Sequence, residues 1–372
     1  MTRAAGIILA AGQSSRLAPE FKPLADLGGT SLLERCAQAF RTAGVTDLLC
    51  VTGHRAGEVR AEALRLGLSC ALNPDYAKGM LTSVRAGLAA LSPDIDAVFM
   101  LPVDIPLVRP ATLRALLARF AEAPAAVLHP VFDGLRGHPP LIPAAFFPAI
   151  LAWEGPGGLA GALEQVSSRD VPVADRNIHF DVDAPEDLAE ARRRWARRGI
   201  PTRVEALALL RLHDAGERGL AHGRGVAAAA LAMARALDAR GACLDLELVE
   251  SAALLHDIAK GQPQHERAGA ALLEALDYGP VARIVAAHRD IPPAEASAIT
   301  ERELVYLADK LVWGSQRVSM EARFGQKLDA FAGDAEACAA IRRRLANAMD
   351  MQGRVEAAAG VSLEDIITRE DA

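Results

Sequence analysis

The sequence predicts an α/β domain with a mostly parallel sheet, followed by an all-α domain. The chain has 372 residues, which is long for a single hydrophobic core and natural for two domains. Short apolar runs alternate with amphipathic segments up to about residue 200, as in parallel sheets flanked by helices. Beyond that point the strand-like runs stop, and alanine-rich helical patterns continue to the end.

The apolar runs of the first half have the length of buried strands. We expect strands at residues 5–9, 47–52, 68–72, 97–101, 126–129 and 170–173. Helical patterns lie between them, for example at 81–91 and at 31–43, where Ser31 and Glu34 have the spacing of a capping box. In such a sheet, ligands bind beyond the carboxyl ends of the strands.

A charged segment at residues 192–203 separates the two differently patterned halves and carries Gly199 and Pro201. We therefore expect domains at residues 1–197 and 204–372. Aromatic residues make up only 4% of the chain, so the cores should consist mainly of Leu, Val and Ala.

Charge and cysteine content exclude several classes of protein. The net charge of −6 leaves no basic footprint for nucleic acid. The five cysteines are scattered and form no C-x-x-C, which argues against a disulfide framework or structural zinc and suits a reducing cytoplasm. No apolar run approaches the roughly 20 residues that span a bilayer. The opening MTRAAGIILAAG is predicted to be a buried strand rather than a signal peptide, so we expect a cytoplasmic protein without membrane or nucleic-acid partners.

The stretch LAAGQSSRLAPEFKPL, residues 9–24, has the composition of a phosphate-binding loop. Small residues after the first strand let backbone N–H groups approach an anion. Arg16 can reach over a triphosphate, and Lys22 can neutralise phosphates from the far side. The alternative is a tight turn without a ligand, and the added arginine and F-K-P-L run argue against it.

Four further motifs follow this loop along the chain: NPDYAKGMLTSVRAGL at 73–88, LPVDIPLV at 101–108, RGHPPLI at 136–142 and FDVDAPEDL at 180–188. With the loop, they resemble the nucleotidyltransferase family that includes molybdenum cofactor cytidylyltransferase and guanylyltransferase. The resemblance covers roughly residues 5–194 and implies a Rossmann-like sheet.

The resemblance also implies residue roles. Nucleotide contacts are expected from Leu9, Ala10, Ala11, Gly12, Ser14, Ser15, Arg16, Lys22, Asn73, Gly79, Ser83 and Asp104, and Met80 matches a family position as well. Asp104 would hold a catalytic magnesium ion, Mg²⁺, and would form the catalytic set together with Arg16 and Lys22. The acceptor would lie near His138, Asp181 and Asp183.

Some of these residues have structural interpretations. Asp183 has the spacing of a helix N-cap, with Glu186 three residues further on. His138 could be a structural histidine with satisfied hydrogen bonds, and His54 is expected to be structural.

The same resemblance indicates the substrates. A loop with Ala10, Ala11 and Gly12 goes with cytidine and a Gly-Gly loop with guanine, so CTP is the expected nucleotide. Molybdopterin is the expected acceptor; a sugar phosphate or another phosphorylated acceptor is the alternative, because such relatives also carry L-A-A-G. An acceptor phosphate would attack the α-phosphorus and release pyrophosphate, while the metal, Arg16, Lys22 and loop amides offset the charge. Molybdoenzymes or their chaperones would be partners.

The second half places histidines and aspartates in several helical patterns. LLHDIAKG contains the adjacent pair His256 and Asp257 on a predicted apolar helix. His222 is expected to open another helix, HGRGVAAAALAMARAL. The full set is His222, His256, Asp257, His265, His288 and Asp309. Such ligands from several helices suit a divalent metal. Buried, hydrogen-bonded core histidines are the alternative.

HDIAK, followed by H-x-x-x-G-A and ADK, resembles the HDIG-type subset of the HD-domain metal phosphohydrolases over about residues 207–318. The resemblance implies a first metal on His222, His256, Asp257 and Asp309, and a second completed by His265 and His288. Mn²⁺, Fe or Mg²⁺ would suit these sites. Asp257 would also orient the attacking water, which makes it a catalytic candidate, and Lys260 would lie near substrate phosphates.

The sequence therefore predicts a bifunctional enzyme that transfers a nucleotidyl group in its first half and hydrolyses a phosphoester or nucleotide in its second. One alternative is that the HD domain is a regulatory nucleotide-binding module. Another is a non-catalytic protein, against which the presence of Lys22, Asp104 and the His-Asp pair argues.

Overall fold

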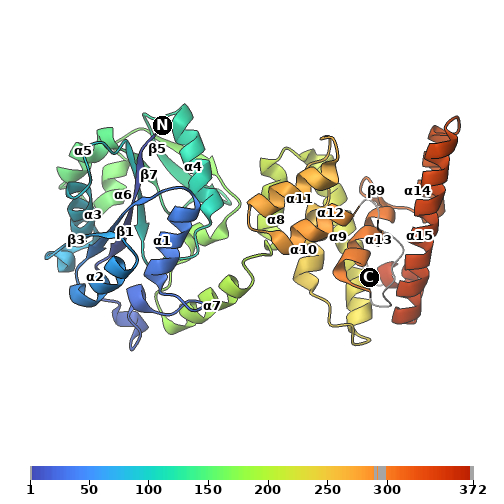
Figure 1. The fold of residues 1–372 in the computed structure, drawn as a ribbon, viewed down its shortest axis with the longest axis horizontal. Helices are drawn as coiled ribbons and strands as arrows, with labels where there is room; N and C mark the ends of the chain where they lie inside the picture. The colour runs from blue at the N-terminus through green and yellow to red at the C-terminus, as the bar shows by residue number, and fades with distance from the viewer. Residues whose placement is uncertain (1, 289–290, 292–298, 369–372) are drawn as a thin grey trace. The chain divides into compact units, whose positions relative to one another are not determined.

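The computed structural model describes residues 2–288, 291 and 299–368. It divides the chain into two compact units, Met1–Arg197 and Arg198–Ala372. Figure 1 shows a sheet flanked by helices in the first unit and a helical second unit. Among the described residues, no helix combines the length and the apolar character that crossing a membrane requires.

A mixed sheet with the strand order β3-β2-β1-β4-β7-β5-β6 forms the centre of the first unit, and β8 pairs with β5. The strands are β1 (Ala4–Ala10), β2 (Asp47–Thr52), β3 (Ser69–Leu72), β4 (Ala97–Pro102), β5 (Val127–Phe132), β6 (Leu135–Arg136), β7 (Leu141–Pro143) and β8 (Ser168–Pro172). Strands β1 to β4 are parallel, β8 is parallel to β5, and β7 is antiparallel to both β4 and β5. The predicted mostly parallel sheet is confirmed, and β6 and β7 are additions to it.

Helices cover both faces of this sheet. Ile7 and Ile8 point to opposite faces because they are neighbours on a strand, and both are fully buried. On one side α1 (Leu32–Thr42) contacts α4 (Pro110–Glu122); on the other α3 (Met80–Ala89) contacts α5 (Phe147–Leu151) and α6 (Gly158–Leu163). Strand β2 is followed by α2 (Ala56–Arg65).

The first helix begins as predicted but without the full capping box. The Ser31 hydroxyl accepts a hydrogen bond from the Glu34 N–H at 3.1 Å. The Glu34 carboxylate accepts from Gln38 and Arg65. The expectation of a reciprocal bond from Glu34 back to Ser31 is therefore wrong, because an arginine on α2 competes for that carboxylate.

The strand order reverses between β1 and β4, which are neighbours in the sheet. The carboxyl ends of these two strands lie side by side, and the Val103 N–H donates to the Leu9 carbonyl at 3.1 Å. In open α/β sheets this is the place where ligands bind. The fold therefore brings the loop after residue 9 next to the segment that carries Asp104.

The second unit is helical. Its helices are α8 (Arg203–Leu212), α9 (Gly216–Asp238), α10 (Leu246–Leu255), α11 (His265–Ala275), α12 (Gly279–Ala287), α13 (Glu301–Lys310), α14 (Met320–Ala330), α15 (Ala335–Ala359) and α16 (Leu363–Thr368). The long helix α9 packs against α8, α10, α13, α15 and α16. Helix α7 (Pro185–Ala196) closes the first unit.

A short hairpin interrupts the helices of the second unit. Strands β9 (Val312–Trp313) and β10 (Gln316–Arg317) pair antiparallel around Gly314, whose φ is +60°. A two-residue connection containing glycine is typical of hairpin turns. Among the residues of this unit that the structure describes, the expectation of an all-α domain thus holds except at this hairpin.

Two helix boundaries near the histidines differ from the sequence prediction. Helix α9 begins at Gly216, so His222 lies within it rather than at its start. Helix α10 ends at Leu255, and His256 is its C-cap residue. The His-Asp pair therefore follows a helix instead of lying on it, which frees both side chains from the angular spacing of adjacent helical residues.

Candidate functional site

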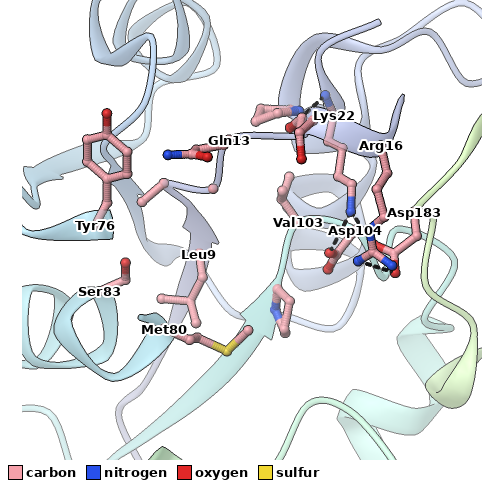
Figure 2. Close-up of a pocket in the computed structure, with 16 residues that line it drawn as sticks. Leu9, Gln13, Arg16, Lys22, Tyr76, Met80, Ser83, Val103, Asp104 and Asp183 are labelled. Atoms are coloured by element: carbon pink, nitrogen blue, oxygen red, sulfur yellow. Dashed lines mark hydrogen bonds and ion pairs between the residues drawn. The ribbon is translucent and has the colours of Figure 1, made fainter. Parts of the chain in front are cut away.

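A pocket of about 330 Å³ opens at the carboxyl ends of β1 and β4. Of the residues expected to contact a nucleotide, those that line it are Leu9, Ala11, Gly12, Ser14, Ser15, Arg16, Lys22, Ser83 and Asp104, together with Met80. Figure 2 shows Lys22, Arg16, Asp104 and Asp183 gathered at one end of this pocket, whereas Tyr76, Ser83 and Met80 lie toward the other.

The loop after β1 is held by its own small side chains. Ser14 adopts a φ of +55°, and its hydroxyl accepts a hydrogen bond from the Lys22 N–H at 3.3 Å. A single helical turn at Ser15–Leu17 follows, and Leu17 is fully buried. This bond folds the loop back so that Lys22 points into the same pocket that Arg16 borders.

The backbone at Gly53, just after β2, packs closely against the loop that follows β1. A Cβ atom on Gly53 would lie 2.8 Å from the Cβ atoms of Ala11 and Tyr76 and 2.9 Å from the Ala11 carbonyl oxygen. The next N–H, of His54, donates to that same carbonyl at 3.0 Å. The His54 ring packs against Phe21 and Tyr76, with centroids 5.8 and 6.1 Å away, in keeping with its expected structural role.

Lys22 forms ion pairs with two aspartates from separate parts of the chain. Its Nζ lies 3.3 Å from Asp104 Oδ2 and hydrogen bonds to Asp183 Oδ1. Arg16 Nη2 contacts the second oxygen of Asp183 at 2.7 Å. The hydrogen bond from Lys22 holds the pKa of Asp183 below its usual value, and the Arg16 charge adds to the effect. Two carboxylates and two cations therefore share one end of the pocket.

The interpretation of Asp183 as a helix N-cap is wrong. Helix α7 has Ala184 as its N-cap residue. The Asp187 carboxylate accepts hydrogen bonds from the N–H groups of Asp183 and Ala184 at 3.1 and 2.8 Å. Because Asp187 performs the capping, and Glu186 has no part in it, the Asp183 side chain is available to Lys22 and Arg16.

Three expected nucleotide ligands do not line the pocket. Ala10 is fully buried in β1. Asn73 is also buried, and its Nδ2 donates to Thr82 Oγ1 and Ser83 Oγ, both at 2.9 Å, so it orients Ser83 from behind. Gly79 has a φ of +116° and precedes α3, which suits a glycine at the entrance to that helix.

Of the expected acceptor ligands, only Asp183 is among the lining residues of the pocket. Asp181 is exposed. The Nδ1 atom of His138 is buried without a hydrogen-bond partner in the described chain, and burial lowers the pKa of this histidine, although Asp104 and Asp181 act in the opposite direction. Gln13 and Tyr76 line the pocket and were not predicted; Gln13 could have been found from its place inside the loop motif.

The second unit brings its six predicted metal ligands together. His222 and His256 place their Nε2 atoms 3.4 and 3.6 Å from Asp309 Oδ1 and 3.7 and 3.4 Å from Asp257 Oδ2. His265 and His288 place Nε2 at 3.3 and 3.7 Å from the other oxygen, Asp257 Oδ1. Asp257 therefore stands between two histidine pairs, with one carboxylate oxygen toward each.

Backbone carbonyls fix the orientation of three of these imidazoles. The Nδ1 atoms of His222, His256 and His288 donate to the carbonyls of Gly314, Ala253 and Val285 at 3.0, 2.8 and 2.7 Å. His256 and His288 are the C-cap residues of α10 and α12, and each ring donates to the carbonyl three residues earlier, in the last turn of its helix. Because Nδ1 bonds to these carbonyls, Nε2 points into the cluster, which is the orientation of metal-binding histidines.

This donor set fits divalent metals. The ligand atoms of His222, His256 and Asp257 lie within 4.8 Å of one another, as do those of Asp257, His265 and His288. The buried Nε2 atoms of His222 and His256 have no hydrogen-bond partner in the described chain. Burial lowers the pKa of His256, but Asp257 and Asp309 outweigh it and raise the pKa to about 9. The cluster thus attracts positive charge at its centre.

A second pocket, of about 420 Å³, opens beside this cluster. Lys260, which was expected near substrate phosphates, lines it and contacts Asp257 Oδ2 at 2.6 Å. Much of its wall comes from α14 and α15, from which no site residue was predicted. These two helices contribute both cationic and apolar side chains to the pocket.

Comparisons with known proteins identify both units. Residues 6–171 match the model of the MobA-like NTP transferase domain. A phosphoenolpyruvate guanylyltransferase from Rubrobacter xylanophilus is 34% identical over 185 residues, which are 86% of that protein and 48% of this chain. The chain belongs to the MobA-like NTP transferase family. Residues 219–314 match the HD domain, so this MobA-like chain carries an HD domain in its second half.

Two further relatives of the MobA-like unit have related activities by name. A molybdenum cofactor cytidylyltransferase from Escherichia coli is 28% identical and matches over 95% of its own length and 51% of this chain. A probable molybdenum cofactor guanylyltransferase from Natronomonas pharaonis is 30% identical, over 96% of its length and 51% of this chain. A crystal structure from Mycobacterium tuberculosis H37Rv is 27% identical, with a TM-score of 0.45, and covers 52% of this chain and 98% of its own.

Proposed function

We propose that the MobA-like unit transfers a cytidylyl group from CTP to molybdopterin in the cytoplasm and releases pyrophosphate. The observation that carries the proposal is the group of Lys22, Asp104 and Asp183 at the carboxyl ends of β1 and β4, beside the small-residue loop. The five cysteines are free thiols, which fits a reducing compartment.

The pocket has one end suited to phosphates and one suited to a base. Lys22, Arg16 and the N–H groups of the loop would approach the phosphates. Asp104 and Asp183 offer carboxylate oxygens, which Mg²⁺ prefers, so they would hold the metal expected here. Bound magnesium would offset the charge that grows on the phosphate oxygens. Tyr76, Ser83 and Met80 would then lie along the base and sugar.

The transfer balances without a covalent enzyme intermediate. A phosphate oxygen of the acceptor forms a bond to the α-phosphorus, and the bond from that phosphorus to the β-phosphate oxygen breaks. Pyrophosphate leaves with the electron pair. The chain's own contribution is to position the two reactants and to stabilise the charge, which is what phosphoryl-type transfers require most.

The preference for cytidine rests on the Ala10-Ala11 version of the loop. The Ala11 side chain is buried at the point where Gly53 and Tyr76 approach the loop, and in this proposal it would limit how deeply a base enters. Relatives of this chain include a cytidylyltransferase and guanylyltransferases by name, and one of the latter is named for phosphoenolpyruvate. Guanylyl transfer and other phosphorylated acceptors are therefore the alternatives that a test must separate.

The test measures pyrophosphate release from each of the four nucleoside triphosphates with molybdopterin, with phosphoenolpyruvate, with a sugar phosphate and without acceptor. We expect release from CTP with molybdopterin, and a loss of about 10²-fold or more in Asp104→Ala. Asp170→Ala is the matched control, because Asp170 lies on β8 with an exposed carboxylate outside the pocket. Activity that survives in Asp104→Ala would exclude the assigned magnesium ligand.

We further propose that the HD domain hydrolyses a phosphoester. His222, His256, Asp257 and Asp309 would hold one divalent metal, and Asp257, His265 and His288 a second. Such metals, when bound, activate water toward phosphorus and offset phosphate charge. Lys260, 2.6 Å from Asp257, would meet a phosphate oxygen at the pocket mouth.

This activity is tested by the release of nitrophenol from p-nitrophenyl phosphate. It should disappear on chelation and return with Mn²⁺ or Fe²⁺. It should also be lost in His256→Ala but kept in His213→Ala, because His213 lies after α8 and outside the cluster. Hydrolysis that persists after thorough chelation would contradict the assignment and favour a regulatory role for the HD domain.

A further inference from the structure

We propose that α14 and α15 make the HD-domain pocket specific for an organic phosphate that carries at least two phosphoryl groups on an apolar body. The proposal rests on the phosphohydrolase function proposed above and adds the class of substrate. It assigns the choice of substrate to residues that lie after residue 314, where the match to the HD domain ends.

The pocket joins the ligand cluster to the two helices. Its lining combines Asp257, His265, His288 and Asp309 of the cluster with residues of α14 and α15. With a volume of about 420 Å³, it lies within the usual range of small-molecule sites. A substrate whose phosphate reached the cluster would therefore extend toward these helices.

Positive charge dominates this pocket. Five cationic side chains line it, against two carboxylates: Lys260, Lys310, Arg323, Lys327 and Arg344 face Asp257 and Asp309. Both carboxylates also belong to the proposed metal sites, so bound divalent ions would increase the positive excess. A substrate with a single phosphoryl group would leave much of this charge uncompensated, because like charges in a partly buried pocket repel each other.

Three of these cations, Lys310, Arg323 and Lys327, lie at successive positions along α13 and α14. Lys310 Nζ lies 2.7 Å from Asp309 Oδ2, and Arg323 Nη2 lies 3.2 Å from Asp309 Oδ1. Lys327 lies one turn further along α14 than Arg323 and lines the same pocket. Burial lowers the pKa of Lys327, and the charges of Arg323 and Lys310 lower it further. An anion at Lys327 would relieve this repulsion at a distance from the phosphate held at the cluster.

Apolar side chains lie among these cations. Phe324 and Ile341 are buried at the pocket wall, and Phe331 is 51% exposed although it lines the pocket. The exposed face of the Phe331 ring offers an apolar surface on which an organic group of the substrate would stack. Inorganic pyrophosphate would match the charge but would leave this ring uncovered, so the pocket favours an organic body attached to the phosphates.

Hydrolysis of such a substrate balances with water alone. The water oxygen forms a new bond to phosphorus, the bond from phosphorus to the leaving oxygen breaks, and the leaving oxygen keeps the electron pair and takes up a proton. Phosphorus keeps its oxidation state, and no further reactant is needed.

The experiment compares adenosine mono-, di- and triphosphate, inorganic pyrophosphate and p-nitrophenyl phosphate in the full chain with Mn²⁺. A Lys22→Met background suppresses nucleotide binding at the first pocket. We expect kcat/KM for the di- and triphosphate to exceed that for the monophosphate and for pyrophosphate by about tenfold or more. Calorimetric binding of adenosine diphosphate provides a readout that does not depend on turnover.

Two variants test the wall, each with a matched control. Lys327→Gln should weaken adenosine diphosphate binding about tenfold, whereas Arg343→Gln, at an exposed α15 residue outside the pocket, should leave this binding unchanged. Phe331→Ala should weaken diphosphate binding without affecting pyrophosphate; Met349→Ala, another exposed α15 residue, is its control.

The outcomes separate this proposal from the one on which it rests. Equal use of mono- and diphosphates, or full diphosphate binding in Lys327→Gln, would overturn the assignment of the wall while p-nitrophenyl phosphate hydrolysis leaves the hydrolase function standing. Diphosphate binding that depends on Lys327 without hydrolysis of any phosphoester would support the wall and refute the hydrolase.

Discussion

The N–H of Val182 donates a hydrogen bond to the carbonyl oxygen of Asp104 at 2.7 Å. This bond ties the segment before α7 to the segment after β4. As a result, the next side chain after Val182, that of Asp183, reaches the same Lys22 ammonium as Asp104 does. The two carboxylates and the lysine therefore form one ion-pair cluster, and a change in any of these three side chains should affect the other two.

Replacement of Lys22 in this ion-pair cluster should strongly impair nucleotidyl transfer. In Lys22→Met the two carboxylates lose their shared cation, and the phosphates lose a positive partner. We expect kcat for pyrophosphate release to fall by about 10²–10³-fold, the usual effect of removing a charge-stabilising donor. Lys78→Met, at an exposed lysine that pairs with Asp75, is the control. A Lys22→Met enzyme as fast as the parent would refute the role.

The close approach at Gly53 predicts a steric effect on nucleotide binding. In Gly53→Ala the new methyl group would meet Ala11 and Tyr76 at 2.8 Å, so the loop must shift. We expect KM for the nucleotide to rise about tenfold, equivalent to about 1.4 kcal/mol, while the circular dichroism spectrum stays the same. Gly57→Ala places the same methyl group where nothing lies within 4 Å, and an equal rise in KM there would contradict the explanation.

Metal binding should stabilise the second unit. A metal that binds the folded state at about 100 times its Kd adds about 2.7 kcal/mol, which raises Tm by roughly 5–10 °C for a unit of this size. Differential scanning calorimetry of chelated protein with and without Mn²⁺ measures this shift. His256→Gln should abolish the shift and His213→Gln should retain it. A Tm of the parent protein that does not change when Mn²⁺ is added would count against the cluster as a metal site.

His129 should make the first unit sensitive to acid. It is buried in β5, and burial, followed by the charge of Arg136, lowers its pKa to about 4. The usual pKa of histidine is about 6.5, so below this pH His129 becomes protonated in the unfolded chain but stays neutral in the folded chain. The free energy of unfolding therefore decreases as the pH falls from about 6.5 to about 4. Urea unfolding at pH 7 and pH 5 should therefore show a smaller loss of stability in His129→Gln than in the parent. An identical loss in both would contradict the assignment.

The parallel part of the sheet could be predicted because its strands are continuous apolar runs with helices between them. Strand β7 could not, because it has only three residues, Leu141–Pro143, and its pairing with β4 and β5 depends on contacts far apart in the sequence. Similarly, the spacing of Asp183 and Glu186 indicated an N-cap. The bond that Asp187 makes, and the position of Lys22 nearby, are tertiary features that local spacing does not encode.

The six clustered histidines and aspartates could be found from the sequence because they lie in recognisable patterns, such as HDIAK or ADK. The wall formed by α14 and α15 did not, because Arg323, Lys327 and Phe331 look like ordinary residues of a solvated amphipathic helix. Their common place in the pocket that also contains Asp309 appears only when α14 and α15 pack against the rest of the unit. Charged residues on a helix face thus carry information about a site only after the fold has placed them.

The ligand-bearing helices α9 to α13 precede the cationic wall in the chain, and wall and ligands occupy different segments. Substitutions in α14 and α15, or replacement of the segment that carries them, could therefore change the substrate-binding part of this pocket while the histidine and aspartate cluster stays intact. Proteins with the same histidines and aspartates would then catalyse the same type of reaction on different substrates.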